Sequence, residues 1–81
     1  MTVEVNIKDY IAKNLLFSDN GYPYSDDASF LEEGIVDSVG IMELVSFVEG
    51  NYKVSVADAD VTPDNFDSVS RLAAYNRRKT G

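Results

Sequence analysis

The stretch FLEEGIVDSVGIMELV, residues 30–45, is the most informative part of this sequence. It contains a glycine, Gly34, that predicts a tight turn. Asp37 stands where a helix N-cap is expected, because its carboxylate can accept a hydrogen bond from a backbone N–H group of the first turn. Apolar residues then recur at helical spacing. The pattern predicts a helix that begins at Ser38 and runs to about Glu49, ending near Gly50-Asn51.

Ser38 lies in the first turn of this predicted helix, and its surroundings allow two interpretations. If Asp37 caps the helix, the Ser38 hydroxyl is free where backbone N–H groups point outward, and a phosphate attached there would be stabilised. If Ser38 is itself the N-cap, a common role for serine, its hydroxyl is occupied by the backbone. Nearby Gly40 is unfavourable, because glycine costs about 1 kcal/mol relative to alanine inside a helix. The local pattern leaves both interpretations of Ser38 open.

Before this stretch the sequence predicts one helix and one long loop. Residues from Val3 to Phe17 carry an apolar residue at every fourth position, which favours an amphipathic helix with Thr2 or Asn6 as its N-cap. Residues 18–36 are rich in turn formers and predict a loop of unusual length. The side chains expected to anchor that loop in the core are those of Phe30, Leu31 and Ile35.

After the central helix the sequence predicts a connector and two further helices. Residues 52–56 alternate like a strand but have no partner strand, so we expect an extended connector with Val54 and Val56 turned inward. Thr62 followed by proline predicts a short helix to about Phe66. Asp67 is expected to cap a final helix from Ser68, whose inner side carries Val69, Leu72, Ala73 and Asn76. The predicted fold class is all-α, a small bundle of three main helices plus one short helix with a long first loop.

The composition limits the classes of protein to consider. The chain has 81 residues, 44% of them hydrophobic, so we expect one small domain over residues 1–81. It has no cysteine and no histidine, which excludes disulfides, thiolate metal sites and serine–histidine catalytic pairs. The sequence contains no apolar run of about 18 residues, which a membrane-spanning helix would require. The N-terminus lacks a signal-peptide pattern. We therefore expect a cytoplasmic protein without membrane insertion.

The net charge of −7 is concentrated in the middle of the chain. Between Lys13 and Lys53 there is no basic residue. That interval contains eight acids, namely Asp19, Asp26, Asp27, Glu32, Glu33, Asp37, Glu43 and Glu49. Such a negative field repels nucleic acid, whose binding requires basic residues, and it attracts proteins with basic patches. The composition leaves two interpretations open, a surface that attracts basic protein partners and a charge that only keeps the protein in solution, and neither includes a nucleic-acid partner.

At residues 37–39, Asp-Ser-Val, the sequence resembles the acyl carrier and peptidyl carrier proteins, whose shared feature is Asp-Ser followed by an aliphatic residue at the start of the second helix. The resemblance continues through Met42-Glu43-Leu44-Val45. It also includes Phe30-Leu31 and Gly34 at the end of the first loop, the segment from Tyr52 to Asp60, and the last helix with Ser68-Val69 and Leu72-Ala73. It therefore covers most of the chain.

This resemblance implies a function and a set of partners. It implies that a phosphopantetheinyl transferase attaches the 4′-phosphopantetheine of coenzyme A to Ser38 through a phosphodiester, so that the protein is a phosphoprotein and a carrier, not an enzyme. The cargo would be acyl or aminoacyl groups held as thioesters for fatty acid or secondary metabolite biosynthesis. A loading ligase and downstream acyl-transfer enzymes would dock on Val39, Met42 and Glu43 next to Asp37. We expect a monomer without a metal site.

The sequence departs from carriers of fatty-acid synthesis in one respect. Gly40, Ser46 and Gly50 stand where acids or larger side chains are common in those proteins. The pattern is more similar to freestanding carriers that serve adenylate-forming ligases or specialised pathways.

The sequence has three other interpretations besides a carrier. An enzyme with Ser38 as its nucleophile lacks histidine and would need a lysine close by as its base. A calcium-binding loop starting at Asp58 would place Pro63 and Val69 where an EF-hand needs glycine and glutamate. A small acidic helical bundle that binds proteins without being modified is the third alternative.

Overall fold

The computed structural model describes residues 2–80, and every regular element in that range is helical. Helix α1 spans Val3–Asn14 and α2 spans Ser38–Tyr52. A 3₁₀ turn, η1, covers Asp58–Asp60, followed by the short helix α3 at Pro63–Phe66 and by α4 at Val69–Thr80. The predicted all-α bundle of three main helices and one short helix is confirmed, whereas η1 was not predicted.

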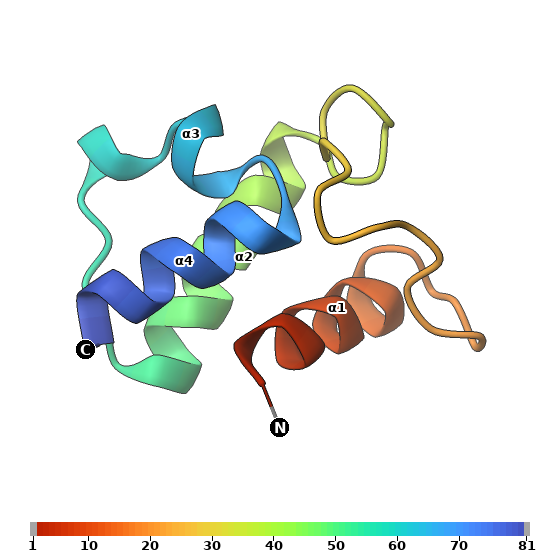
Figure 1. Ribbon diagram of the computed structural model, residues 1–81, viewed down its shortest axis with the longest axis horizontal. Coiled ribbons are helices and arrows are strands. Elements are labelled where there is room, and N and C mark those ends of the chain that lie inside the picture. Colours follow the sequence, from red (N-terminus) through yellow and green to blue (C-terminus); the bar gives the residue numbers. More distant parts are fainter. Residues whose placement is uncertain (1, 81) are drawn as a thin grey trace.

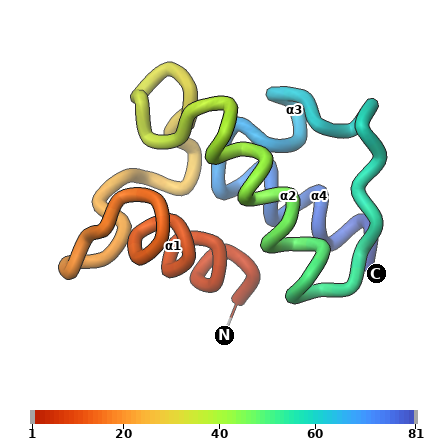
Figure 2. Tube along the Cα trace, turned by 180° about the vertical axis from the view of Figure 1, so that it is seen from behind, coloured from red at the N-terminus to blue at the C-terminus, as the bar shows by residue number. Residues whose placement is uncertain are grey.

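Helix α4 is the central element of the bundle. It packs against α1, α2 and α3, and it lies in front of α2 in Figure 1 and behind it in the reverse view of Figure 2. Its predicted inner side is buried as expected at Val69, Leu72, Ala73 and Asn76. The core joins these to the buried side chains Ile7, Ile11, Phe30, Ile35, Val36, Leu44, Val45, Val48, Val54, Phe66 and Tyr75. The long loop between α1 and α2 occupies one end of the molecule (Figure 1).

Helix α1 begins where one of the two predicted caps places it. The Thr2 hydroxyl accepts a hydrogen bond from Val5 N at 3.1 Å, so Thr2 and not Asn6 is the N-cap. The helix ends at Asn14, three residues before the predicted Phe17. The prediction was wrong there because the chain turns sharply: Phe17 has a left-handed φ of 53°, and Ser18 N donates back to the carbonyl of Ala12.

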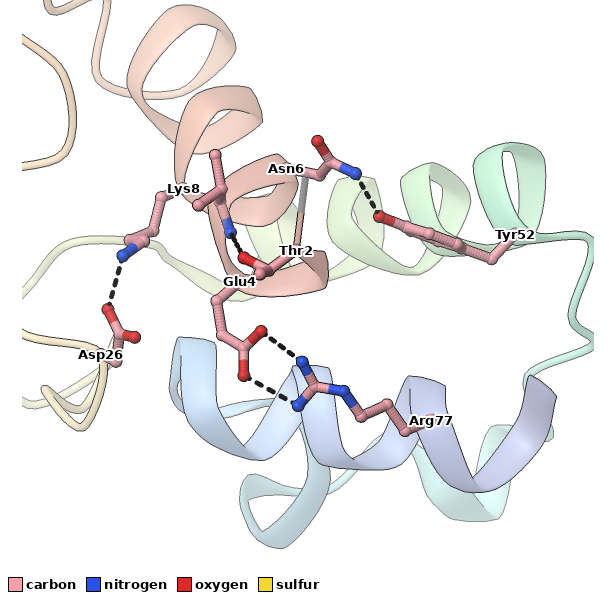
Figure 3. Close-up of polar contacts among 8 residues, drawn as sticks. Thr2, Glu4, Asn6, Lys8, Asp26, Tyr52 and Arg77 are labelled. Carbon is pink, nitrogen blue, oxygen red and sulfur yellow. Dashed lines mark hydrogen bonds and ion pairs between the residues drawn. The ribbon is translucent and has the colours of Figure 1, made fainter. Parts of the chain in front are cut away.

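Three polar contacts tie α1 to other parts of the fold (Figure 3). Glu4 forms a two-pronged ion pair with Arg77 of α4, and the guanidinium lowers the pKa of the Glu4 carboxyl. Asn6 donates to the Tyr52 hydroxyl at the end of α2, at 2.8 Å. Lys8 pairs with Asp26 of the long loop at 3.0 Å. These contacts orient α1 against both neighbouring helices and the loop.

Helix α2 continues to Tyr52, past the predicted end near Glu49. Gly50 and Asn51 remain helical, and the helix stops at Lys53, which has a left-handed φ of 55°. The extra turn places the Tyr52 ring edge-to-face with Phe47, at a centroid distance of 6.3 Å, and its hydroxyl on Asn6. This tertiary packing outweighs the weak helix preference of glycine and asparagine.

Asp67 does not cap the final helix, so that prediction was wrong. Ser68 takes this role, because its hydroxyl accepts a hydrogen bond from Arg71 N at 3.1 Å. Asp67 binds the long loop: its carboxylate accepts from the Ser29 hydroxyl and from Leu31 N, and its carbonyl accepts from Phe30 N at 2.7 Å. The loop is therefore fastened to the turn between α3 and α4.

Two of the three predicted loop anchors are correct. Phe30 and Ile35 are buried, and the chain closes on itself where Ile35 N donates to the carbonyl of Phe30 at 2.8 Å. Gly34 has a φ of 66° and forms the predicted tight turn. Leu31 was assigned wrongly, because it is 49% exposed. Its backbone N–H is held by Asp67, which leaves its side chain outside the core.

The segment between α2 and α4 confirms the predicted connector. Residues 53–57 have no regular structure, Val54 is buried and Val56 packs against the core. Asp60 at the end of η1 accepts a hydrogen bond from the buried Tyr75 hydroxyl at 2.8 Å. Burial, followed by this hydrogen bond, raises the pKa of Tyr75 to about 12. The phenol thus stays protonated and fastens η1 to α4.

Gly40 is explained by its contact with Val36. A Cβ atom on Gly40 would lie 2.5 Å from Val36 Cγ1, and Val36 is itself buried. Valine is stiff about χ1, so its methyl group cannot swing away easily. Only glycine lets the chain before α2 pack this closely on the first turn of the helix.

We predict that Gly40→Ala lowers the free energy of unfolding by about 1–3 kcal/mol, because the added methyl group overpacks the contact with Val36. Gly50→Ala is the matched control: Gly50 lies in the same helix, and a Cβ there meets no atom within 4 Å. That control should gain about 0.5–1 kcal/mol from helix propensity. Urea denaturation measures both, and equal effects would refute the steric explanation.

Candidate functional site

The first turn of α2 shows which residue caps the helix. Asp37 has extended backbone angles, and its Oδ1 accepts a hydrogen bond from Gly40 N at 2.8 Å. Asp37 is thus the N-cap and Ser38 the first residue of the helix. The alternative in which Ser38 itself caps α2 is wrong.

The Ser38 hydroxyl is available for chemistry. Ser38 is exposed, and within residues 2–80 no side-chain hydrogen bond engages its hydroxyl. The first N–H groups of a helix have no partners inside the helix and carry a partial positive charge. A phosphate attached to Ser38 would lie next to these free N–H groups. The capping carboxylate of Asp37 is bound to Gly40 N, two residues after Ser38.

A cleft of about 320 Å³ lies beside Ser38, between α2, α3 and the end of the long loop. Most of its lining is apolar. The lining residues are Leu31, Ser38, Ile41, Met42, Val61, Thr62, Pro63, Phe66 and Asp67. The Asp67 carboxylate is already engaged by Ser29 and Leu31, so the cleft offers mainly apolar surface to a group attached at Ser38.

Three apolar side chains around Ser38 are exposed to solvent. Val39 is 69% exposed and Met42 is 54% exposed. Both are docking residues predicted from the family resemblance. Leu31 joins them from the loop, which sequence analysis missed because it assigned this leucine to the core. Exposed aliphatic side chains of this size, gathered around one serine, form a surface suited to contact with another protein.

The acids near Ser38 carry uncompensated charge. Within residues 2–80 the four ion pairs use Glu4, Asp9, Asp26 and Asp60. None of these pairs includes Asp37 or Glu43 at α2, or Glu32 and Glu33 in the adjacent loop. Four carboxylates without a cation partner therefore belong to the start of α2 and the loop before it, and their charge would draw a partner with basic side chains.

The residues required by a serine enzyme are not assembled at Ser38. Lys8, Lys13 and Lys79 are held in ion pairs with aspartates. Lys53 caps the opposite end of the 15-residue helix α2, which at 1.5 Å per residue is about 22 Å away. Neither of the two depressions at the start of α2 is lined by a lysine of residues 2–80 that could act as the base for Ser38.

The metal-site alternative finds no support in the described part of the chain. No group of three or more acidic side chains is arranged to hold a metal ion between residues 2 and 80. Asp60, two residues after the Asp58 that would start a calcium loop, accepts a hydrogen bond from Tyr75 and pairs with Lys79. Across the same residues, no helix is long and apolar enough to cross a membrane.

Comparison with known proteins gives a family match over most of the chain. The family model described as "Phosphopantetheine attachment site" matches residues 7–75, which is most of the chain and includes Ser38. No curated protein gives a significant match to the sequence.

We predict that Asp37→Ala destabilises the protein by about 1 kcal/mol, because the Gly40 N–H loses its capping oxygen. Asp37→Ser supplies another capping oxygen and should recover most of that loss. Urea denaturation of the two variants measures the difference. An equal loss in both would show that the capping hydrogen bond is not what Asp37 contributes.

Proposed function

Because this chain belongs to the phosphopantetheine attachment-site family, we propose that it carries acyl or aminoacyl groups as thioesters on a 4′-phosphopantetheine arm attached to Ser38. Membership makes the protein a carrier that bears this prosthetic group and does not catalyse a reaction itself. The attachment residue and the cargo classes are the specific content of the proposal. The observation that carries it is the free, exposed hydroxyl of Ser38 at the start of α2.

The attachment reaction assigns a simple role to Ser38. Its Oγ forms a bond to the phosphorus that bears the pantetheine of coenzyme A, and the bond from that phosphorus to the adenosine bisphosphate breaks. The hydroxyl proton passes to a base of the transferase, because this chain has no histidine and no lysine near Ser38. The N–H groups at the start of α2 then stabilise the negative phosphodiester.

The residues around Ser38 fit an attached arm. When bound, the arm supplies the thiol that holds the cargo, and the chain has no cysteine that would compete with it. Leu31, Met42 and Phe66 line the cleft beside Ser38 and offer apolar contacts to the arm or its cargo. The open cleft suits an arm that must leave the carrier to reach other enzymes.

The surface around Ser38 supports specific partners. Carrier domains of this family are modified by phosphopantetheinyl transferases and act with enzymes of their pathway. We propose that the transferase, a loading ligase and downstream acyl-transfer enzymes dock on Val39, Met42 and Glu43. The two apolar side chains supply contact area, and Glu43 carries an unpaired charge that favours a basic partner.

We predict that the protein gains the mass of one phosphopantetheine when incubated with coenzyme A, Mg²⁺ and a promiscuous phosphopantetheinyl transferase. Ser38→Ala should gain none, because the accepting oxygen is missing. Ser46→Ala, which removes an exposed serine from the same helix, is the matched control and should be modified like the wild type. Intact-protein mass spectrometry measures all three.

Two outcomes would contradict the proposal. If several transferases leave the wild-type mass unchanged, the unmodified protein-interaction module becomes the better hypothesis. If Ser38→Ala is still modified, the arm is attached elsewhere.

We also predict that Glu43→Lys slows loading by about fivefold at 0.01 M salt and much less at 0.5 M, because salt screens charges between docking surfaces. Asp58→Lys makes the same change in net charge at an exposed site in η1, beyond the other end of α2. That control should change the loading rate little. Initial rates at both salt concentrations measure the effect, and a salt-independent loss would argue against electrostatic docking at Glu43.

A further inference from the structure

Phe17 combines two features that are unfavourable for the folded chain. Its side chain is 81% exposed, more than that of any other large hydrophobic residue recorded as exposed in residues 2–80. Its backbone has a φ of 53°, in the left-handed region that glycine and asparagine adopt most readily. The turn that ends α1 would form at lower cost with glycine at this position, and the phenylalanine ring adds no core packing in return.

The chain next to Phe17 lines a notch that adjoins the attachment site. Leu15 lies on one side of a depression of about 260 Å³, and Asp37, Val39 and Glu43 lie on the other. Asp37 and Val39 are the two neighbours of Ser38 in the sequence. In both views of the backbone the C-terminal end of α1 and the start of α2 lie at the same end of the molecule (Figures 1 and 2).

A partner that handles Ser38 has to cover this region. A protein–protein interface of ordinary size buries about 800 Å² on each partner, far more than the first turn of α2 presents. The notch carries the surface from Val39, the residue after Ser38, to Leu15, which stands two positions before Phe17 in the chain. Phenylalanine is, with tyrosine and tryptophan, enriched at protein interfaces relative to the rest of the surface.

We propose that Phe17 and the adjoining notch form a second part of the docking surface, bound by the phosphopantetheinyl transferase that modifies Ser38. This inference rests on the proposed function. The transferase would insert an apolar side chain between Leu15 and Val39 and place a basic side chain at Asp37 and Glu43. Apolar side chains meet two carboxylates there, neither of which has a cation partner in residues 2–80, and a segment that is basic and apolar is complementary to both. The ring of Phe17 would rest in an apolar pocket of the transferase.

The experiment measures binding without transfer. In a Ser38→Ala background, the dissociation constant for a phosphopantetheinyl transferase shown to load the wild-type protein is measured by calorimetry, with and without Phe17→Gly. Removal of a dominant aromatic contact should weaken binding by about tenfold. The melting temperature of Phe17→Gly should stay the same or rise, because glycine adopts the positive φ of this position without the steric cost that a Cβ atom imposes.

Two control variants separate docking from other effects. Phe17→Tyr keeps the aromatic ring and should bind within about twofold of the parent protein. Val5→Ala shortens another exposed apolar side chain, in the first turn of α1 at the other end of that helix, and should leave binding unchanged. The same variants made with Ser38 intact can be loaded by the transferase. Their kcat/KM values for loading should follow the same order as their affinities.

The outcomes distinguish this inference from the proposal on which it rests. If the wild type is loaded but Phe17→Gly binds and loads as well as Phe17→Tyr, the docking role of Phe17 is refuted and the carrier function stands. If no transferase loads the wild type, the proposed function fails and the inference fails with it. A tenfold loss confined to Phe17→Gly, with an unchanged or higher melting temperature, supports both.

Discussion

The hydrogen bonds made by Asp67 are the constraint on which the arrangement of this fold depends. Asp67 lies in the turn between α3 and α4, and it receives Ser29, Phe30 and Leu31 from the end of the long loop. Two hydrogen bonds go to its carboxylate and one to its carbonyl, so the loop is held in position and in orientation. Phe30 is thereby directed into the core, and the chain that follows it is brought to the place where α2 begins. A loop of this length would otherwise leave the start of α2 poorly positioned.

The exposure of Ser38 follows from that anchoring and from two local interactions. Val36 is buried against Gly40. Because Gly40 has no side chain, the segment that contains Val36 can pack closely on the first turn of α2. Asp37 then caps the helix, and the next residue, Ser38, is left with a free hydroxyl facing solvent. Packing on one side and an open cleft on the other suit the role proposed for Ser38, in which a transferase reaches the hydroxyl and the residue then holds a flexible arm.

Charge is distributed in the folded protein so that the surface near Ser38 stays negative. The ion pairs fasten α1 to α4, α1 to the loop, and η1 to α4, away from the start of α2. The acids at residues 32, 33, 37 and 43 take no part in any ion pair of the described chain. Electrostatic attraction between proteins chiefly accelerates encounter and selects partners, and it adds less to the final affinity. This distribution fits a carrier that must meet several enzymes briefly.

The sequence by itself determined the main helices, the connector and the start of α2 at Ser38, because these depend on apolar spacing and on contacts between residues three or four positions apart. It left open whether Asp37 or Ser38 caps α2, and the structure decided for Asp37. The sequence also determined the tight turn at Gly34 and the buried side of α4.

The tertiary structure alone decided that Asp67 holds the loop, that Leu31 faces outward, and that Gly40 makes room for Val36. It also set where α1 and α2 end, through the turn at Phe17 and the packing of Tyr52. Some of these features join residues that are distant in the chain, such as Asp67 and Leu31, which stand 36 positions apart. Others conflict with local preference, such as the left-handed backbone of Phe17. A local pattern cannot encode them, because their free energy arises only when the elements have already come together.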